Sequence, residues 1–148
     1  MREAAIISTA RTGLAKAMRG GFNKTHGITM GGHTVKHAIA KAGIEAGEVE
    51  DIIFGCGQPE AATGHNIGRN VAIAGGCPVT VPGTTINRFC SSGLQSIAVA
   101  AHRIIVDGVN VTIGGGVESI SMTQANMNTK HLVEPELQKV CPALWMPM

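Results

Sequence analysis

The chain has 148 residues, a net charge of +2 and a composition that is 44% hydrophobic but only 3% aromatic. This length fits one ordinary domain with a real core. The few aromatic side chains disfavour nucleic acid binding, and the scattered charges form no basic run that would select a partner. No apolar stretch reaches membrane-spanning length and the first residues lack a secretory signal, so we expect a soluble, cytoplasmic protein that binds neither membranes nor nucleic acid.

Short apolar runs of strand length alternate with helical patterns along the chain. The expected strands are residues 4–9, 51–55, 84–89 and 109–114. A first helix buries Val35 and Ile39 and ends at Gly43, and a second begins at the N-cap Asn66 and ends at Gly75. These two helices separate the first three expected strands.

The clearest helix follows Cys90 and ends before Gly108. Its apolar residues recur at the spacing of one helix face, which we expect to be buried; they are Leu94, Ile97, Ala98, Ala101, Ile104 and Ile105. After Ser121 the pattern fails, and we expect an irregular segment with one short helix near Leu137. We therefore expect an α/β domain over 1–121 and an irregular segment over 122–148.

The order of elements is βαβαβαβ, which predicts the α/β fold class. Each return to a parallel strand needs a crossover, and here the crossovers are helices. We therefore expect a mostly parallel sheet covered by helices on both faces.

The four cysteines, Cys56, Cys77, Cys90 and Cys141, form no C-x-x-C pair and are expected to be free thiols. Only Cys90 stands at a strand-to-helix turn, where ligands bind in α/β sheets. Unpaired N–H groups and the helix dipole favour a thiolate there, and the same N–H groups can hold an oxyanion. Position alone leaves two interpretations open, a nucleophile or a buried packing cysteine. The other three cysteines are expected to have no chemical role.

Two other groups of residues are set aside. His33 and His37 have helical metal-ligand spacing but lack the glutamate of a zinc-protease helix, so no metal site is expected. Gly114 to Gly116 in "GGGVES" precede no P-loop lysine, and close backbone packing near the site is expected instead. Glu118 is assigned no chemical step.

The stretch "NRFCSSGLQSI" resembles the acyl-enzyme signature of the thiolases. The segments "ARTGLAKAMRGGF", "EVEDIIFGCGQPEAATGHNIGRNVAIAGG", "VPGTTINRFC" and "GGGVESIS" are similar to thiolase segments in the same order. The resemblance covers essentially the whole chain and implies a thiolase-like N-terminal half, with an incomplete α/β domain over 1–121 and the truncated start of the loop domain over 122–148. Gly13 stands where thiolases commonly have proline.

The resemblance implies that Cys90 takes an acyl group from an acyl-CoA, with its backbone N–H as an oxyanion donor. An acetyl-CoA carbanion or free CoA then removes that group, so CoA thioesters are substrates and no cofactor is needed. Fatty acid metabolism is the implied context. Met148 corresponds to a methionine that lines the acyl and pantetheine pocket.

In the thiolases a histidine, a second cysteine and an asparagine complete the site, and all lie beyond the part that this chain resembles. The chain alone is therefore expected to be inactive, to pack on a C-terminal half and to form a homodimer or homotetramer. Alternatives are a ketosynthase-type condensing enzyme, or a non-catalytic thiolase-like protein that binds acyl-CoA or lipid.

Overall fold

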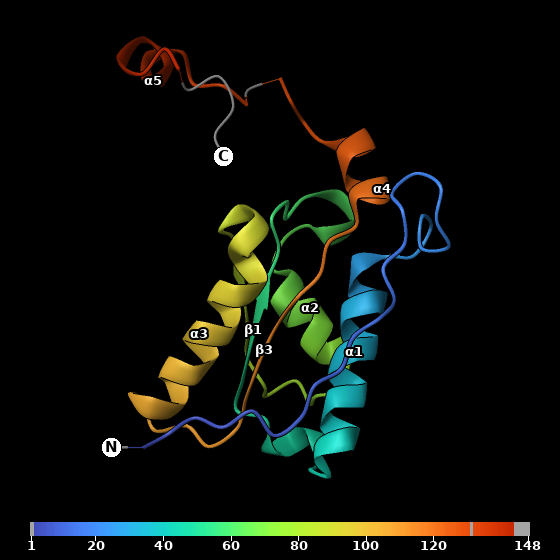
Figure 1. Ribbon diagram of the computed structural model, residues 1–148, viewed down its shortest axis with the longest axis vertical. Helices are drawn as coiled ribbons and strands as arrows, with labels where there is room; N and C mark the ends of the chain where they lie inside the picture. The colour runs from blue at the N-terminus through green and yellow to red at the C-terminus, as the bar shows by residue number, and fades with distance from the viewer. Residues whose placement is uncertain (1, 131, 144–148) are drawn as a thin grey trace.

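Three parallel strands alternate with helices in the computed structural model, which describes residues 2–130 and 132–143 (Figure 1). The strands form one sheet in the order β2-β1-β3, with β1 hydrogen-bonded to both neighbours. In chain order the helices and strands are α1 (Gly27–Ala42), β1 (Asp51–Gly55), α2 (Ile67–Ala74), β2 (Gly83–Ile86), α3 (Ser92–Ile105), β3 (Thr112–Gly116), α4 (Ile120–Thr123) and α5 (Pro135–Val140). The predicted α/β class and parallel sheet are confirmed.

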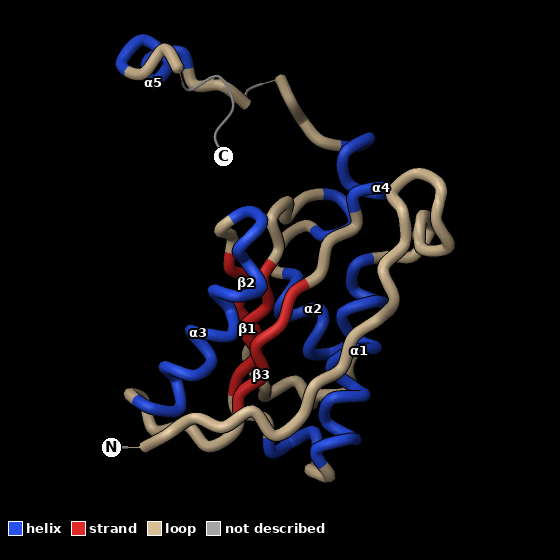
Figure 2. The backbone as a smooth tube through the Cα atoms, in the orientation of Figure 1, coloured by secondary structure: helices blue, strands red, loops and turns tan. Residues whose placement is uncertain are grey.

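Helices cover both faces of this sheet, as the crossover rule requires. Figure 2 shows α3 on one face, with α1 and α2 on the other. Helix α3 packs on β1 and β3, whereas α2 packs on β1 and β2 and carries α1 on its side. Helix α5 lies apart from these layers.

The core lies between the sheet and the α1–α2 pair. All five residues of β1 are buried, as expected for the central strand of a parallel sheet. Phe54 and Ile52 of β1 meet Val35, Ile67 and Val71 from the two helices, and each of these side chains is at most 2% exposed.

The predicted helix ends are confirmed by their caps. Gly43 ends α1 in the left-handed conformation at φ 70°, which glycine adopts without steric cost. Asn66 begins α2 by accepting a hydrogen bond from the backbone N–H of Arg69. The expected short helix near Leu137 is α5.

The predicted strand at residues 4–9 is wrong. This segment is not a strand. Two side-chain hydrogen bonds connect it to α1: Ser8 Oγ donates to Ala38 O at 2.8 Å, and Lys41 Nζ donates to Thr9 O at 3.4 Å. A cavity of about 650 Å³ lies between the segment and β3, α1 and α3. An apolar run has the composition of a strand, but only a ladder of backbone hydrogen bonds makes it one.

The predicted buried face of α3 is also wrong. The residues that α3 buries against the sheet are Ser92, Ser96 and Ala100, whereas Leu94 is 73% exposed. The reason is the close approach of helix and sheet, since a Cβ at Gly114 would lie 2.7 Å from Ile97 Cα. Small side chains permit that approach, and none of the six apolar residues expected on the buried face is fully buried.

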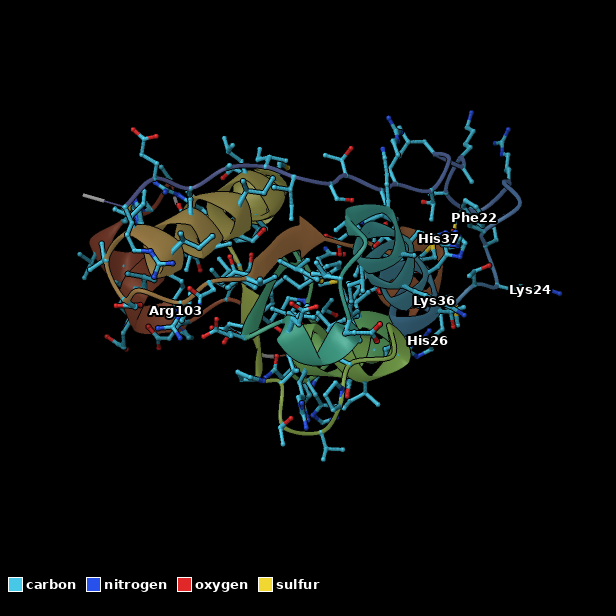
Figure 3. All side chains as sticks on the ribbon, turned by 90° about the horizontal axis from the view of Figure 1, so that it is seen from below. Phe22, Lys24, His26, Lys36, His37 and Arg103 are labelled. Atoms are coloured by element: carbon cyan, nitrogen blue, oxygen red, sulfur yellow. The ribbon has the colours of Figure 1, made fainter. Side chains whose placement is uncertain are left out.

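Basic side chains from residues 24–37 gather on the α1 side. Figure 3 shows Lys24, His26, Lys36 and His37 together at one end of the molecule and Arg103 at the other. Residues 4–44 contain no aspartate or glutamate. The described residues include no helix that is long and apolar enough to cross a membrane.

Candidate active site

The ends of all three strands contribute to one region of the structure. The segment Cys56–Gln58 follows β1, the turn Asn87–Ser91 follows β2, and Glu118 comes two residues after β3. Because parallel strands end at the same edge of a sheet, these segments lie beside one another. A backbone hydrogen bond joins the first segment to the end of β2, since Cys56 N donates to Ile86 O at 3.0 Å.

Cys90 lies where sequence reasoning placed it, at the start of α3. It is the middle residue of a short 3-10 turn, Phe89–Ser91, that leads directly into the helix, and it is exposed. The N-cap Ser91 makes no side-chain capping bond, and the first N–H group of α3, that of Ser92, donates to Phe89 O within the turn. The sulfur is accessible beside the positive end of a 14-residue helix.

Two serines hold the cysteine turn. Ser92 Oγ accepts a hydrogen bond from Arg88 N at 2.9 Å and donates to Phe89 O at 2.6 Å, and its side chain is buried. Ser91 Oγ donates to Arg88 O at 2.9 Å. The small residues around Cys90 therefore do more than leave space, since they fix the turn that presents it.

Phe89, directly before Cys90, has a left-handed backbone with φ 48°. This conformation costs a bulky residue on the order of 1–3 kcal/mol and persists only where the surroundings impose it. Part of that support comes from Asn87 Oδ1, which accepts a hydrogen bond from Phe89 N at 2.9 Å. The backbone of the turn is thus strained at Phe89, the residue directly before Cys90.

Glycines at the strand ends bring the sheet against the cysteine turn. A Cβ at Gly55 would lie 2.4 Å from the carbonyl carbon and oxygen of Ser92, and one at Gly116 would lie 3.0 Å from Gly55 O. Ser96 Oγ bonds across the same contact to Gly115 O at 2.5 Å. The predicted close backbone packing at residues 114–116 is confirmed.

Glu118 binds the segment that follows β1. Its Oε2 accepts from Gly57 N at 2.8 Å, and its Oε1 accepts from Gln58 N at 3.3 Å and from Cys56 Sγ at 3.5 Å. Farther along, the buried Thr63 donates through Oγ1 to Gln58 O at 2.6 Å and contacts Thr123 Oγ1 at 3.1 Å. The segment after β1 is therefore fixed at both ends.

The other cysteines differ from Cys90 in burial and position. Burial, followed by the nearby Glu118 carboxylate, raises the pKa of Cys56 to about 11, and burial also raises the pKa of Cys77. Both therefore remain protonated thiols near neutral pH. Cys141 is exposed at the end of α5, and all four cysteines are free thiols. Cys56 and Cys77 are thus buried, whereas Cys141, like Cys90, is exposed.

The remaining predicted residues fall outside this region or outside the described residues. Met148 lies outside the described residues. His33 and His37 are exposed on α1 with ring centroids 4.3 Å apart. Within residues 2–130 and 132–143, no cluster of three or more histidine, cysteine or acidic side chains could hold a metal ion.

Sequence reasoning missed Asn87, which bonds within the cysteine turn, and assigned no role to Glu118, which bonds to residues 56–58. Asn87 carried one usable signal, because asparagine side chains often bond the backbone two residues on. Glu118 comes two residues after a strand end, which places a carboxylate at the edge where ligands bind. No local pattern could show that its partner is the segment at residues 56–58, about sixty positions earlier.

Comparison with known proteins identifies relatives over most of the chain. A family model, the N-terminal domain of thiolase, matches residues 4–140. A 3-ketoacyl-CoA thiolase of Bacillus subtilis (strain 168) is 43% identical over 137 residues, which cover 93% of this chain and 34% of that protein. Proteins of the same name from Acinetobacter baumannii and Pectobacterium carotovorum are 36% identical over 117 residues and 32% identical over 127 residues.

These two matches cover 79% and 85% of this chain, and 30% and 33% of the relatives. The chain thus spans about a third of the length of the relatives that it matches. The family match includes the three strands, the cysteine turn and Glu118. The chain belongs to the thiolase family.

Proposed function

We propose that this chain supplies the nucleophilic cysteine of an acyl-CoA C-acyltransferase of the thiolase type. One observation carries the proposal: Cys90 is exposed at the start of α3, at the edge of the sheet where all three strands end. The names of the relatives, 3-ketoacyl-CoA thiolases, support the choice of CoA thioesters as substrates.

In the first step the Cys90 thiolate attacks the carbonyl carbon of an acyl-CoA. The carbonyl oxygen becomes an oxyanion, which the backbone N–H of Cys90 and the start of α3 would stabilise. The bond from carbon to the CoA sulfur then breaks, CoA leaves as a thiolate that takes up a proton, and the acyl group stays on Cys90.

In the second step a nucleophile removes the acyl group from Cys90. In the synthetic direction a carbanion formed from acetyl-CoA attacks the acyl carbonyl and displaces the Cys90 thiolate, giving a β-ketoacyl-CoA. In the cleavage direction Cys90 first attacks the keto carbon of a β-ketoacyl-CoA, the acetyl-CoA carbanion leaves and takes up a proton, and a CoA thiolate then displaces Cys90 to give an acyl-CoA. Forming the carbanion needs a base that takes a proton from the acetyl methyl group. We propose that this base belongs to the part of the enzyme that the relatives contain beyond the matched third.

The exposed apolar face of α3 supports a partner for this chain. Leu94 and Ile97, three residues apart on this helix, are 73% and 43% exposed. Covering that face would stabilise the structure by about 25 cal/mol per Å² of apolar surface buried. We propose that the C-terminal half of the same enzyme covers it, and that the complete enzyme is a homodimer or homotetramer in the cytoplasm.

A chimaera tests the function. This chain replaces the matching third of the Bacillus subtilis thiolase, and cleavage of acetoacetyl-CoA by CoA is followed. We expect turnover from the chimaera and its loss, by a factor of about 10³ or more, in Cys90→Ser. Turnover that survives Cys90→Ser, or an inactive chimaera beside an active parent enzyme, would overturn the proposal.

A further inference from the structure

We propose that Glu118 is a positioning residue for Cys90: it clamps the segment Cys56–Gln58, and that segment supports the turn that carries the cysteine. The inference rests on the proposed function, because it concerns how the nucleophile of that reaction is held. Neither the family match nor the names of the relatives assign a role to this carboxylate.

The clamp uses both oxygens of one side chain. Glu118 Oε2 accepts from Gly57 N at 2.8 Å, and Oε1 accepts from Gln58 N at 3.3 Å. Bonds from N–H groups to a carboxylate are stronger than bonds between neutral groups, and two of them fix direction as well as distance. The thiol of Cys56 gives the same Oε1 a third donor at 3.5 Å.

Gly57 connects this clamp to the cysteine turn. A Cβ built at Gly57 would lie 3.1 Å from Glu118 Oε2 and 3.3 Å from Phe89 O, so the glycine fits closely between them. Phe89 precedes Cys90 and holds a left-handed backbone that needs support from its neighbours. Glu118 thereby supports Cys90 indirectly, through the backbone of Gly57 and Phe89.

Position and charge predict opposite effects for Glu118. A negative charge near a thiolate disfavours the thiolate, so a role through charge alone would make Cys90 less reactive. A role through position makes Cys90 more reactive, because the sulfur stays beside the N–H groups at the start of α3. Removing the carboxylate therefore separates the two roles by the sign of the change.

The test is the rate of alkylation of Cys90 by iodoacetamide near neutral pH, followed by peptide mass spectrometry on this 148-residue chain. The first variant is Glu118→Gln, which keeps the shape but turns an amide NH₂ toward one of the two backbone donors. We expect the alkylation rate of Cys90 to fall about five-fold, since one hydrogen bond to a charged acceptor is lost.

A second variant, Gly57→Ala, keeps the carboxylate and pushes the segment against Phe89 O and Glu118 Oε2. We expect the same slowing, now without any change of charge. The matched control is Glu50→Gln: Glu50 Oε1 accepts from Asn110 N at 2.7 Å, a similar bond at the opposite end of the sheet. We expect this control to leave the Cys90 rate within two-fold of the wild type.

An unchanged or faster rate in Glu118→Gln and Gly57→Ala overturns the proposal. Alkylation of the buried Cys77 in the same samples reports unfolding, because that thiol reacts only when the fold opens. If Cys77 becomes reactive in both variants, Glu118 supports the fold as a whole and the positioning role is overturned. A wild-type Cys90 that reacts no faster than Cys141 would count against the proposed function, whereas the role of Glu118 is read from the ratio of variant to wild type.

Discussion

Gly55 at the end of β1 touches Ser92 in the first turn of α3 with no space for a side chain between them. A Cβ at position 55 would lie 2.4 Å from the backbone carbon and oxygen of Ser92. This contact places the cysteine turn directly on the central strand. It also explains why α3 approaches the sheet through serine and alanine rather than through its larger apolar residues.

The Gly55→Ala variant should therefore destabilise the protein. The added methyl group must displace backbone rather than a side-chain end, so we expect a loss of about 1–3 kcal/mol in the free energy of unfolding, measured by urea titration. The matched control is Gly93→Ala, because a Cβ at Gly93 meets nothing within 4 Å. If both variants were equally stable, the close contact between strand and helix would be wrong.

The four thiols should differ in reactivity according to their positions. Cys90 and Cys141 are exposed, whereas Cys56 and Cys77 are buried with raised pKa values. Near neutral pH we expect iodoacetamide to label Cys90 first, about ten-fold faster than Cys141, because only Cys90 lies at a helix start. Peptide mapping over time measures the rates, and equal labelling of all four would refute an activated Cys90.

Stability should fall at high pH through Cys56. Its pKa is raised from 9.0 to about 11 in the folded protein, so the folded state holds the proton more tightly than the unfolded chain. The stabilisation is complete below about pH 9 and is lost as the pH rises through about 11. Comparing urea titrations at these two pH values, we expect a smaller fall for Cys56→Ser, which keeps a donor but does not titrate in this range. An identical fall in both proteins would show that the Cys56 thiol does not contribute.

The order of elements could be predicted from the sequence because it depends on local patterns. Gly43 and Asn66 mark helix ends through their own backbone and side-chain chemistry, and β1 was predicted to the residue. The position of Cys90 at the start of α3 followed from the change of period around it. These features need only a few neighbouring residues.

The errors concern features that depend on distant partners. Residues 4–9 have a strand's composition but no ladder, and pairing is decided by the other strand. The apolar stripe that begins at Leu94 is expected to face the sheet. However, the close approach of α3 to Gly55 and Gly114 leaves room only for its small side chains. The bonds of Glu118 to residues 57 and 58 join strand ends about sixty positions apart, which no local pattern reveals.

The chain by itself should show no thiolase turnover. It spans about a third of the length of its relatives, and the base that forms the acetyl-CoA carbanion is proposed to lie in the rest. With acetoacetyl-CoA and CoA as substrates, we expect no rate above the uncatalysed reaction, measured by the absorbance of the β-ketoacyl thioester. Turnover by these 148 residues would show that the whole catalytic set lies within them.

Transfer of an acyl group to Cys90 is the most direct test of the account. The chimaera with the Bacillus subtilis enzyme is mixed with acetyl-CoA, quenched in acid and digested. The mass of the peptide that contains Cys90 is then measured by mass spectrometry. We predict one acetyl group on Cys90, which disappears when CoA is added before quenching, and none in Cys90→Ser. An acetyl group on another residue, or an active chimaera in which Cys90 is never acylated, would contradict the account.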